Sequence, residues 1–410
     1  MGSTRFSLRW FVGAAVGLAL LGVSREARAY PEMTRYGYGN CSSCHVSVTG
    51  GGLLSEHGRV LSKEIISHGR FFFEKGPETL DTGGSPAPLV ASEESREESF
   101  LYGAVSTPAW LQLGGNLRFR QLIEDTPSAV TGRFLVMRLD LEAAITDGKR
   151  FTLVGTLGRS EPNGNAAADS PLSYLISRRH WLSVKMGPEG GQGELDRYQL
   201  RVGRFYYAYG LQIDEPTMLT RGLMGFAEEQ ETYNVEFTYF TTDTQVHATV
   251  VMGRPDNPQL GVEQGFSLQA GHAVSDRVKL GGNIYTGKAT NAASNTRRWL
   301  VGPYAIFSWS RTVYTLFELN ATYADALGSG GTQMTKTGWE FSRGVQAFVT
   351  QEYARVAGSP RSYSRDNYGL GLQYFPRPHW EFSAIGRRER SHAVSADFAN
   401  VLWFTLHYYL

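Results

Sequence analysis

The sequence predicts a mainly β protein, a transmembrane β-barrel of the outer-membrane type with a small α-helical segment in front of it. Three observations carry this prediction. Segments of about ten residues with alternating apolar and polar side chains recur through most of the chain. Aromatic residues and glycine are frequent, with 22 Phe, 21 Tyr, 8 Trp and 47 Gly, which is typical of β-rich proteins. The chain also ends on an amphipathic strand.

The first 29 residues have the features of a secretory signal peptide. Arg5 and Arg9 precede an apolar stretch at 10–23, and Ala-Arg-Ala at 27–29 is typical of a cleavage site. A single membrane-anchoring helix is the alternative. We expect residues 1–29 to direct export through the Sec pathway and the mature chain to begin near Tyr30.

The net charge of the chain restricts the kinds of partner that it can bind. A formal net charge of +1 is unlike that of a polybasic protein, so we expect no nucleic-acid partner. After the N-terminus, no apolar run approaches the roughly 20 residues that a membrane-spanning helix needs. Any crossing of a membrane would therefore be made by strands.

The only two cysteines, Cys41 and Cys44, stand three residues apart and are followed by His45. C-x-x-C-H is the attachment motif of c-type haem, because two thiols on one turn reach both vinyl groups of a porphyrin and the histidine binds the iron. A zinc site would need further ligands, a thioredoxin-like site would need a βαβ setting, and a disulfide at this spacing would be strained. We predict one covalent haem c on Cys41 and Cys44, with His45 as an axial ligand of the iron.

The second axial ligand is open at the sequence level. His57, His68 and Met33 are the nearby candidates. Residues 53–68 are predicted to form an amphipathic helix whose apolar face includes His57. A sixth position without a protein ligand is the further alternative.

Composition divides the rest of the chain. We assign residues 30–75 to a monohaem cytochrome c segment, 76–107 to a linker rich in Pro, Gly, Ser and acidic residues, and 108–410 to the barrel. A segment as short as 30–75 buries little surface by itself. We therefore expect it to pack in or at the lumen of the barrel.

The alternation is clear in individual segments. In TYNVEFTYF, residues 232–240, the aromatic and aliphatic side chains share one face, and Asn234, Glu236 and Thr238 share the other. A soluble β-sandwich of this length would be unusual, and a propeller should show a repeat of about 40–50 residues, which the sequence lacks. At roughly 20 residues per strand and loop, we expect 14–16 strands and favour 16, since bacterial barrels take even numbers. A barrel of that size has a lumen unless something fills it.

The last strand is similar to the recognition strand of outer-membrane barrels. It places Leu402, Phe404, Leu406, Tyr408 and Leu410 on one face and runs to the final residue. The pattern of that strand usually ends in Phe, whereas this chain ends in Leu. We expect the protein to lie in the outer membrane of a Gram-negative bacterium, in contact with its lipid.

The complete arrangement resembles the fused monohaem cytochrome–porins of iron-oxidising bacteria. The matching motifs lie within residues 33–61: an aromatic-basic stretch before the C-x-x-C-H motif, then L-x-x-x-G-R at Leu54, Gly58 and Arg59. The resemblance implies haem attachment at Cys41 and Cys44, with His45 as axial ligand. It implies a haem within the barrel that receives electrons from an extracellular donor, Fe(II) in that family, and passes them to a periplasmic carrier such as a soluble cytochrome. That family often has another aromatic residue where His57 stands.

Other polar residues carry weaker predictions. Acidic residues in expected loops are candidates for brief Fe(II) binding: Asp214, Glu215, Glu228, Glu229 and Glu231. Paired arginines are expected to line the lumen or meet lipid head groups: Arg178/Arg179, Arg297/Arg298 and Arg387/Arg388. No nucleophile triad, P-loop or dinucleotide motif is present, so we name no catalytic residue; any enzymatic activity would be Fe(II) oxidation.

Three functions are compatible with the sequence. The first is an outer-membrane electron conduit with one haem. The second is a porin or uptake channel whose haem-bearing plug is structural, sensory or gating. The third is a periplasmic cytochrome attached to a soluble β domain.

Overall fold

The computed structural model describes most of the barrel and a short part of the chain before it. The described ranges are 32–36, 38–69, 100, 105–126, 128–159, 175–186, 198–213, 218–226, 230–256, 263–291, 294–325, 328–355, 364–392 and 397–410. The predicted signal peptide and most of the predicted linker lie outside them.

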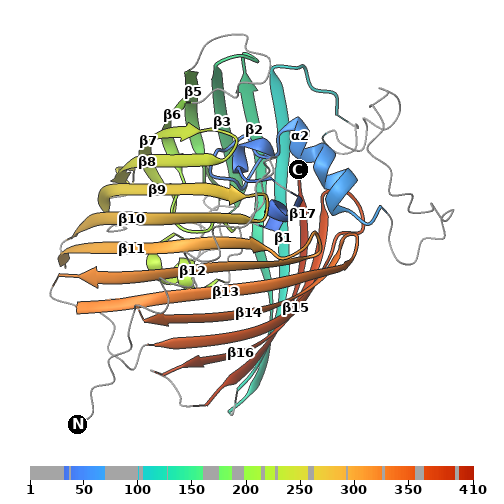
Figure 1. Ribbon diagram of the computed structural model, residues 1–410, viewed down its shortest axis with the longest axis vertical. Helices are drawn as coiled ribbons and strands as arrows, with labels where there is room; N and C mark the ends of the chain where they lie inside the picture. The colour runs from blue at the N-terminus through green and yellow to red at the C-terminus, as the bar shows by residue number, and fades with distance from the viewer. Residues whose placement is uncertain are drawn as a thin grey trace.

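A single antiparallel sheet closes on itself to form the barrel (Figure 1). The strand β1 pairs with β2 on one side and with β17 on the other, which completes the ring. The short β4 and the longer β5 both pair with β3 and occupy one position, so the 17 strands among the described residues make a wall of 16. The prediction of 16 strands is confirmed. The strands are β1 Leu111–Asp125, β2 Val130–Thr146, β3 Phe151–Arg159, β4 Leu175–Ile176, β5 His180–Met186, β6 Tyr198–Phe205, β7 Thr232–Phe240, β8 Thr244–Gly253, β9 Gln264–Ser275, β10 Val278–Asn291, β11 Ser294–Ser308, β12 Val313–Ala324, β13 Gly328–Ser342, β14 Val345–Arg355, β15 Arg365–Tyr374, β16 Trp380–Ser391 and β17 Ala399–Tyr409.

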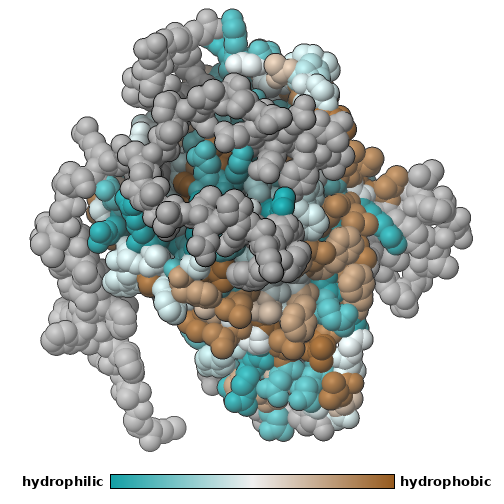
Figure 2. Space-filling model, turned by 90° about the vertical axis from the view of Figure 1, so that its right-hand side faces the viewer, coloured by the Kyte–Doolittle hydropathy of each residue, from teal (hydrophilic) through white to brown (hydrophobic). Residues whose placement is uncertain are grey.

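The two faces of the wall have opposite polarity. Along β12, Leu319 and Tyr323 are 45% and 49% exposed, whereas Glu318 and Asn320 point inward and are buried. An apolar outer face and a polar inner face reverse the pattern of a soluble protein and match a barrel surrounded by lipid. Figure 2 shows hydrophobic side chains gathered on the outside of the wall. Among the described residues, no helix is long and apolar enough to cross a membrane.

The two ends of the barrel differ in their connections. The start of β1 and the C-terminal Leu410 lie at one end, where Leu410 N donates to Gly115 O over 3.0 Å. That end has short turns such as 241–243, 276–277 and 343–344, and the longest connection between described strands, 206–231, leaves the other end. Short turns mark the periplasmic side of outer-membrane barrels, so we refer to the end with Leu410 as the periplasmic mouth.

Residues 32–69, here called the N-terminal segment, lie at the periplasmic mouth. Their elements are the short 3-10 helices η1 Glu32–Tyr36 and η2 Cys41–Ser43, the α-helix α2 Glu56–Leu61 and the π-helical η3 Ser62–Ile66. The predicted helix over 53–68 is thus shorter than expected. The Ser55 hydroxyl accepts the N–H of Gly58 over 3.1 Å and so caps α2 at its start.

A second segment enters the barrel from the wall itself. Residues 206–213 and 218–226, here called the inward loop, connect β6 towards β7 and include the helix α3 Leu219–Met224 (Figure 1). Tyr209 and Met224 of this loop are fully buried against wall residues such as Tyr285 and Leu300. The lumen is therefore occupied from two directions.

Candidate functional site

The C-x-x-C-H motif forms one tight turn in the N-terminal segment. Both Cys44 N and His45 N donate to Cys41 O, over 3.2 and 3.0 Å. Cys41 and Cys44 are free thiols on a single turn, with His45 directly after them. The turn therefore keeps the two cysteines and the histidine adjacent, which the predicted haem attachment needs.

Two glycines allow the backbone to pass close around the motif. At Gly50, with φ +74°, an added Cβ would lie 3.4 Å from Cys41 Sγ. At Gly58, an added Cβ would lie 2.1 Å from the backbone oxygen of Cys44, which no side chain can tolerate. Gly58 belongs to the L-x-x-x-G-R motif, and the structure gives a physical reason for it: α2 packs directly on the turn that carries the cysteines.

The environment of the thiols keeps them protonated. Cys44 is buried, and this burial raises its pKa to about 12, with a smaller contribution from Cys41. Burial also raises the pKa of Cys41, although the ammonium group of Lys279 acts in the opposite direction. An uncharged, shielded pair of thiols fits a buried attachment point rather than a reactive surface thiol.

Contacts on both sides of the motif fix it against one part of the wall. Before it, Asn40 Nδ2 donates to Thr241 O over 2.7 Å, and Lys279 Nζ donates to Gly39 O over 2.5 Å. After it, Gln245 Nε2 donates to Val48 O over 3.0 Å. The partners come from β8, β10 and the turn between β7 and β8, so this part of the wall faces the motif.

A small cavity lies between the motif and the inward loop. It has a volume of about 30 Å³, which is room for a single water molecule. Its lining comes from the N-terminal segment, the inward loop and the wall, and includes Cys41, Val48, Leu211, His247, Lys279 and Tyr304.

The donor set fits a c-type haem, because two free thiols on one turn and an adjacent histidine are what such a group binds. The space does not yet accommodate it, since a porphyrin is much larger than the cavity beside Cys41. Binding would require the N-terminal segment and the inward loop around Gly210–Gln212 to separate. When bound, the haem would supply one-electron redox chemistry.

The three predicted distal ligands lie elsewhere in the N-terminal segment. Met33 is buried and lines a different cavity with Ile66 and Phe375. His57 is exposed, with its ring 5.6 Å from that of Tyr38. His68 binds the turn between β13 and β14, with Nδ1 3.0 Å from Arg343 O. None of the three lines the cavity beside Cys41, and their role as ligands stays a prediction.

The other polar candidates are divided between the lumen and undescribed residues. Asp214, Glu215, Glu228 and Glu229 lie outside the described residues. Glu231 is buried, 3.9 Å from Arg204. Within the described part of the chain, no group of three or more His, Cys, Asp or Glu side chains is arranged to hold a metal ion.

Only the pair Arg178/Arg179 faces the lumen as a whole, which is one of the two predicted alternatives. In the other two pairs Arg298 and Arg387 face inward and their neighbours Arg297 and Arg388 are exposed. Arg178 bonds Asp140 over 2.9 Å and Arg179 bonds Glu142 over 3.0 Å, all buried inside the barrel. Sequence reasoning missed a related network opposite the motif, in which Arg201 of β6 bonds Glu236 of β7 over 2.7 Å. Alternation along the strands placed these residues on the inner face, but only strand pairing shows that they meet.

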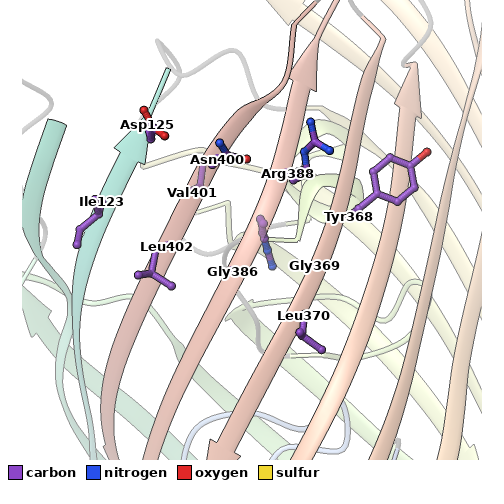
Figure 3. Close-up of a pocket in the computed structure, with 11 residues that line it drawn as sticks. Ile123, Asp125, Tyr368, Gly369, Leu370, Gly386, Arg388, Asn400, Val401 and Leu402 are labelled. Atoms are coloured by element: carbon purple, nitrogen blue, oxygen red, sulfur yellow. The ribbon is translucent and has the colours of Figure 1, made fainter. Parts of the chain in front are cut away.

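A larger cavity of about 550 Å³ opens on the outside of the wall, across β15, β16, β17 and β1 (Figure 3). Outward-facing side chains such as Tyr368, Leu370 and Leu402 line it, and Gly386, which also faces outward, leaves it hollow. This cavity faces the lipid and is separate from the motif.

The closed wall, its apolar outer face and the loop folded into its lumen define an outer-membrane β-barrel of the porin type. The comparisons agree on the fold. No protein-family model matches the chain, and no curated protein matches its sequence. Among solved structures, outer-membrane-expressed OmpT of Vibrio cholerae matches with a TM-score of 0.55 at 12% identity, over 73% of this chain and 97% of that one. OprB of Pseudomonas putida gives 0.52 at 10% identity, over 73% and 94%.

The anion-selective porin from Comamonas acidovorans also matches, with a TM-score of 0.51 at 9% identity, over 73% of this chain and 99% of that one. At these identities the likeness shows the porin-type barrel fold, and nothing finer.

Proposed function

We propose that this chain is an outer-membrane electron-transfer protein with one covalent c-type haem on Cys41 and Cys44 and with His45 as an axial ligand. It would take electrons from an extracellular donor and pass them to a periplasmic carrier. The observation that carries the proposal is the position of the C-x-x-C-H turn, which is held inside the periplasmic mouth of a closed barrel.

The barrel has a physical purpose in this proposal. The apolar band of an outer membrane is about 25 Å tall and blocks electron flow. A redox group inside the barrel shortens the distance to both sides, and a group at the periplasmic mouth is accessible to a soluble cytochrome. The buried residues of the inward loop, such as Tyr209, Met224 and Phe226, fill space that solutes would need. This filling favours electron transfer over solute passage.

The donor follows from the resemblance to the cytochrome–porins. Ferrous iron is a one-electron donor and suits a single haem. Its oxidation outside the membrane would also leave the insoluble product outside. We therefore propose Fe(II) as the extracellular donor, with a soluble cytochrome as the periplasmic acceptor.

A second candidate function is a porin or uptake channel in which the haem-bearing segment is a structural, sensory or gating plug. The porin-type fold supports it, since the matched structures with TM-scores above 0.5 include an anion-selective porin. The two functions differ in what crosses the barrel: electrons in the first, solutes in the second.

Stopped-flow spectroscopy of the purified protein mixed with Fe(II) tests the proposal. We expect a covalent haem whose α-band reports fast reduction, with both properties lost in Cys44→Ala, while the matched surface variant His57→Ala keeps them. A haem that dithionite reduces and Fe(II) does not would reject iron as donor. Conductance in planar bilayers without redox turnover would favour the channel. Absence of covalent haem in the wild-type protein would reject both.

A further inference from the structure

The cavity on the outside of the wall lies at the seam where the barrel closes. It has a volume of about 550 Å³ and extends over β15, β16, β17 and β1, so it crosses the pairing of the last strand with the first. This volume is in the range of sites that hold small ligands. The surrounding face is apolar and meets lipid, so the molecule that fills the cavity is expected to be a lipid.

Strand register arranges the outward-facing residues of the cavity in two rows. The row nearer the extracellular end, opposite the periplasmic mouth, is polar and consists of the cross-strand neighbours Tyr368, Arg388, Asn400 and Asp125. The next row, two residues closer to the periplasmic mouth, consists of Leu370, Gly386, Leu402 and Ile123. Figure 3 shows Arg388, Asn400 and Asp125 at one end of the cavity and Leu370 towards the other. The cavity is therefore amphipathic along the membrane normal.

Gly386 makes the apolar row hollow. An added Cβ at Gly386 would meet one backbone oxygen, that of Leu370, at 4.0 Å. The side chains on either side, Leu370 and Leu402, are 64% and 37% exposed and form the walls of the hollow. A hydrocarbon chain lying over Gly386 would gain dispersion contacts with both leucines.

Arg388 supplies a positive charge at the polar end. Its guanidinium lies 4.9 Å from the ring centre of Phe398, and among the described residues it has no carboxylate partner. The nearby Asp366 is already bound by Arg390 over 2.7 Å and by His392 over 2.8 Å. Asp125 is two strands away from Arg388, about 10 Å across the sheet. An arginine at the edge of an apolar band favours an anionic partner, and phosphate matches its fork of donors.

We infer that this cavity binds lipid A, the phosphorylated glycolipid of the outer leaflet of outer membranes. One acyl chain would lie over Gly386, a phosphate would bond Arg388, and Asn400 and Asp125 would bond hydroxyl and amide groups of the sugar. The position of the polar row towards the extracellular end selects the outer leaflet. The inference rests on the outer-membrane location in the proposed function and does not involve the haem. A lipid bound in this way would contact both strands of the seam.

Native mass spectrometry of the purified full chain in detergent, titrated with bisphosphorylated lipid A, tests the inference. We expect the wild-type protein to bind one lipid A before any further ones. Arg388→Gln should weaken that first step by about tenfold or more, because it removes a charge-assisted bond to phosphate. Gly386→Leu should weaken it as well, because the new side chain fills the hollow. The two variants alter opposite ends of the site, so misfolding of one, seen by heat-modifiable gel mobility, leaves the other as a test.

Two substitutions elsewhere on the outer face are matched controls. Gly155 on β3 is exposed and has no atom within 4 Å of an added Cβ, so Gly155→Leu adds the same side chain without filling the cavity. Arg297 on β11 is exposed on the outer face near the same end of the barrel as Arg388. We expect Gly155→Leu and Arg297→Gln to bind lipid A as the wild type does.

Four results would overturn the inference. Equal weakening by Arg297→Gln would show general attraction of an anionic lipid to the wall. Equally tight binding of dephosphorylated lipid A would remove the role of Arg388, and equal competition by phosphatidylglycerol would remove the selection of lipid A. Oligomers without lipid that dissociate in Gly386→Leu would assign the cavity to a second copy of the chain. Haem staining of a denaturing gel and fractionation of the wild-type protein test the proposed function separately, so its failure is distinguishable from these results.

Discussion

The two segments that fill the lumen are held by different forces. The inward loop packs through aromatic rings: Tyr209 stacks on Phe226 at 4.5 Å, and Tyr207 stacks on Tyr285 of the wall at 5.6 Å. The N-terminal segment is held mainly by polar bonds to strands and turns at the periplasmic mouth, such as Gln245 Nε2 to Val48 O over 3.0 Å and Arg343 Nε to Ser67 O over 2.8 Å. Its apolar contact with wall residues is made by Leu53, with Val46.

This difference means that the inward loop contributes to the folding of the barrel, whereas the N-terminal segment docks onto the folded wall. A buried aromatic side chain is worth about 3–5 kcal/mol on truncation, whereas a typical hydrogen bond contributes about 0.5–1.5 kcal/mol net. The inward loop therefore belongs to the core of the barrel. The N-terminal segment adds many small contributions, and single changes should loosen it without unfolding the wall. Under the proposed function, this order would suit a segment that receives a porphyrin before or while it enters the mouth.

The largest loss of stability is expected from a substitution in the inward loop. Phe226→Ala should destabilise the barrel by about 3–5 kcal/mol, because it removes a ring packed on Tyr207, Tyr209 and Tyr285. Urea unfolding followed by heat-modifiable gel mobility measures the change. Phe341→Ala is the control, since Phe341 is 49% exposed on the outer face and should cost far less in detergent. Equal losses for the two variants would contradict a core role for the loop.

A matched pair of helical glycines tests the two segments directly. Gly58→Ala in α2 would press Cβ against the Cys44 carbonyl and should loosen the N-terminal segment by about 1–3 kcal/mol. Gly222→Ala in α3 has no atom within 4 Å of the added Cβ, and it should leave the loop unchanged or stabilise it by about 0.5–1 kcal/mol. Hydrogen exchange measures the protection of the N-terminal segment and of the inward loop in both variants. Protection of the N-terminal segment unchanged by Gly58→Ala would show that α2 does not pack on the motif as described.

Alkaline pH should release the N-terminal segment in protein made without haem attachment. The pKa of Cys44 is about 12 in the docked state and about 8.5 in a free chain. A raised thiol pKa stabilises docking fully below about pH 8.5, and this stabilisation declines as pH rises towards 12. At pH 9, iodoacetamide should modify Cys44 roughly 800-fold more slowly in folded than in urea-unfolded protein, since only the thiolate reacts. Equal rates would mean that Cys44 is not buried in solution.

The smallest change in protection is expected from substitutions of two glutamines on neighbouring strands. Gln245→Ala removes the bond to Val48 O and should lower protection of the N-terminal segment by about 1 kcal/mol. Gln269→Ala removes a bond to the inward loop and should not affect residues 32–69. Hydrogen exchange again measures both. If Gln269→Ala exposed the N-terminal segment as strongly as Gln245→Ala, the two segments would be coupled rather than independent.

The sequence by itself determined the fold class, a range of 14–16 strands and the polarity of each face, and strand pairing in the structure decided for 16. Alternation is a local property, so the order of residues along β7 is enough to place Glu236 and Thr238 on its inner face. The motif was also local, because Cys41, Cys44 and His45 are adjacent in the chain. The capped start of α2 at Ser55 and the fold of residues 206–226 into the lumen were not predicted, since neither leaves a periodic signal.

Only the tertiary structure decided which part of the wall the motif meets. Asn40 and Thr241 are 201 residues apart in sequence, and Gln245 and Val48 are 197 apart. Periodicity states the face of a strand that a residue occupies but not its neighbours across the lumen. Those neighbours depend on the register of each strand pair and on the closure of β1 with β17. Both are set by all 16 strand positions of the ring together. His247 comes to share a cavity with Cys41 for this reason.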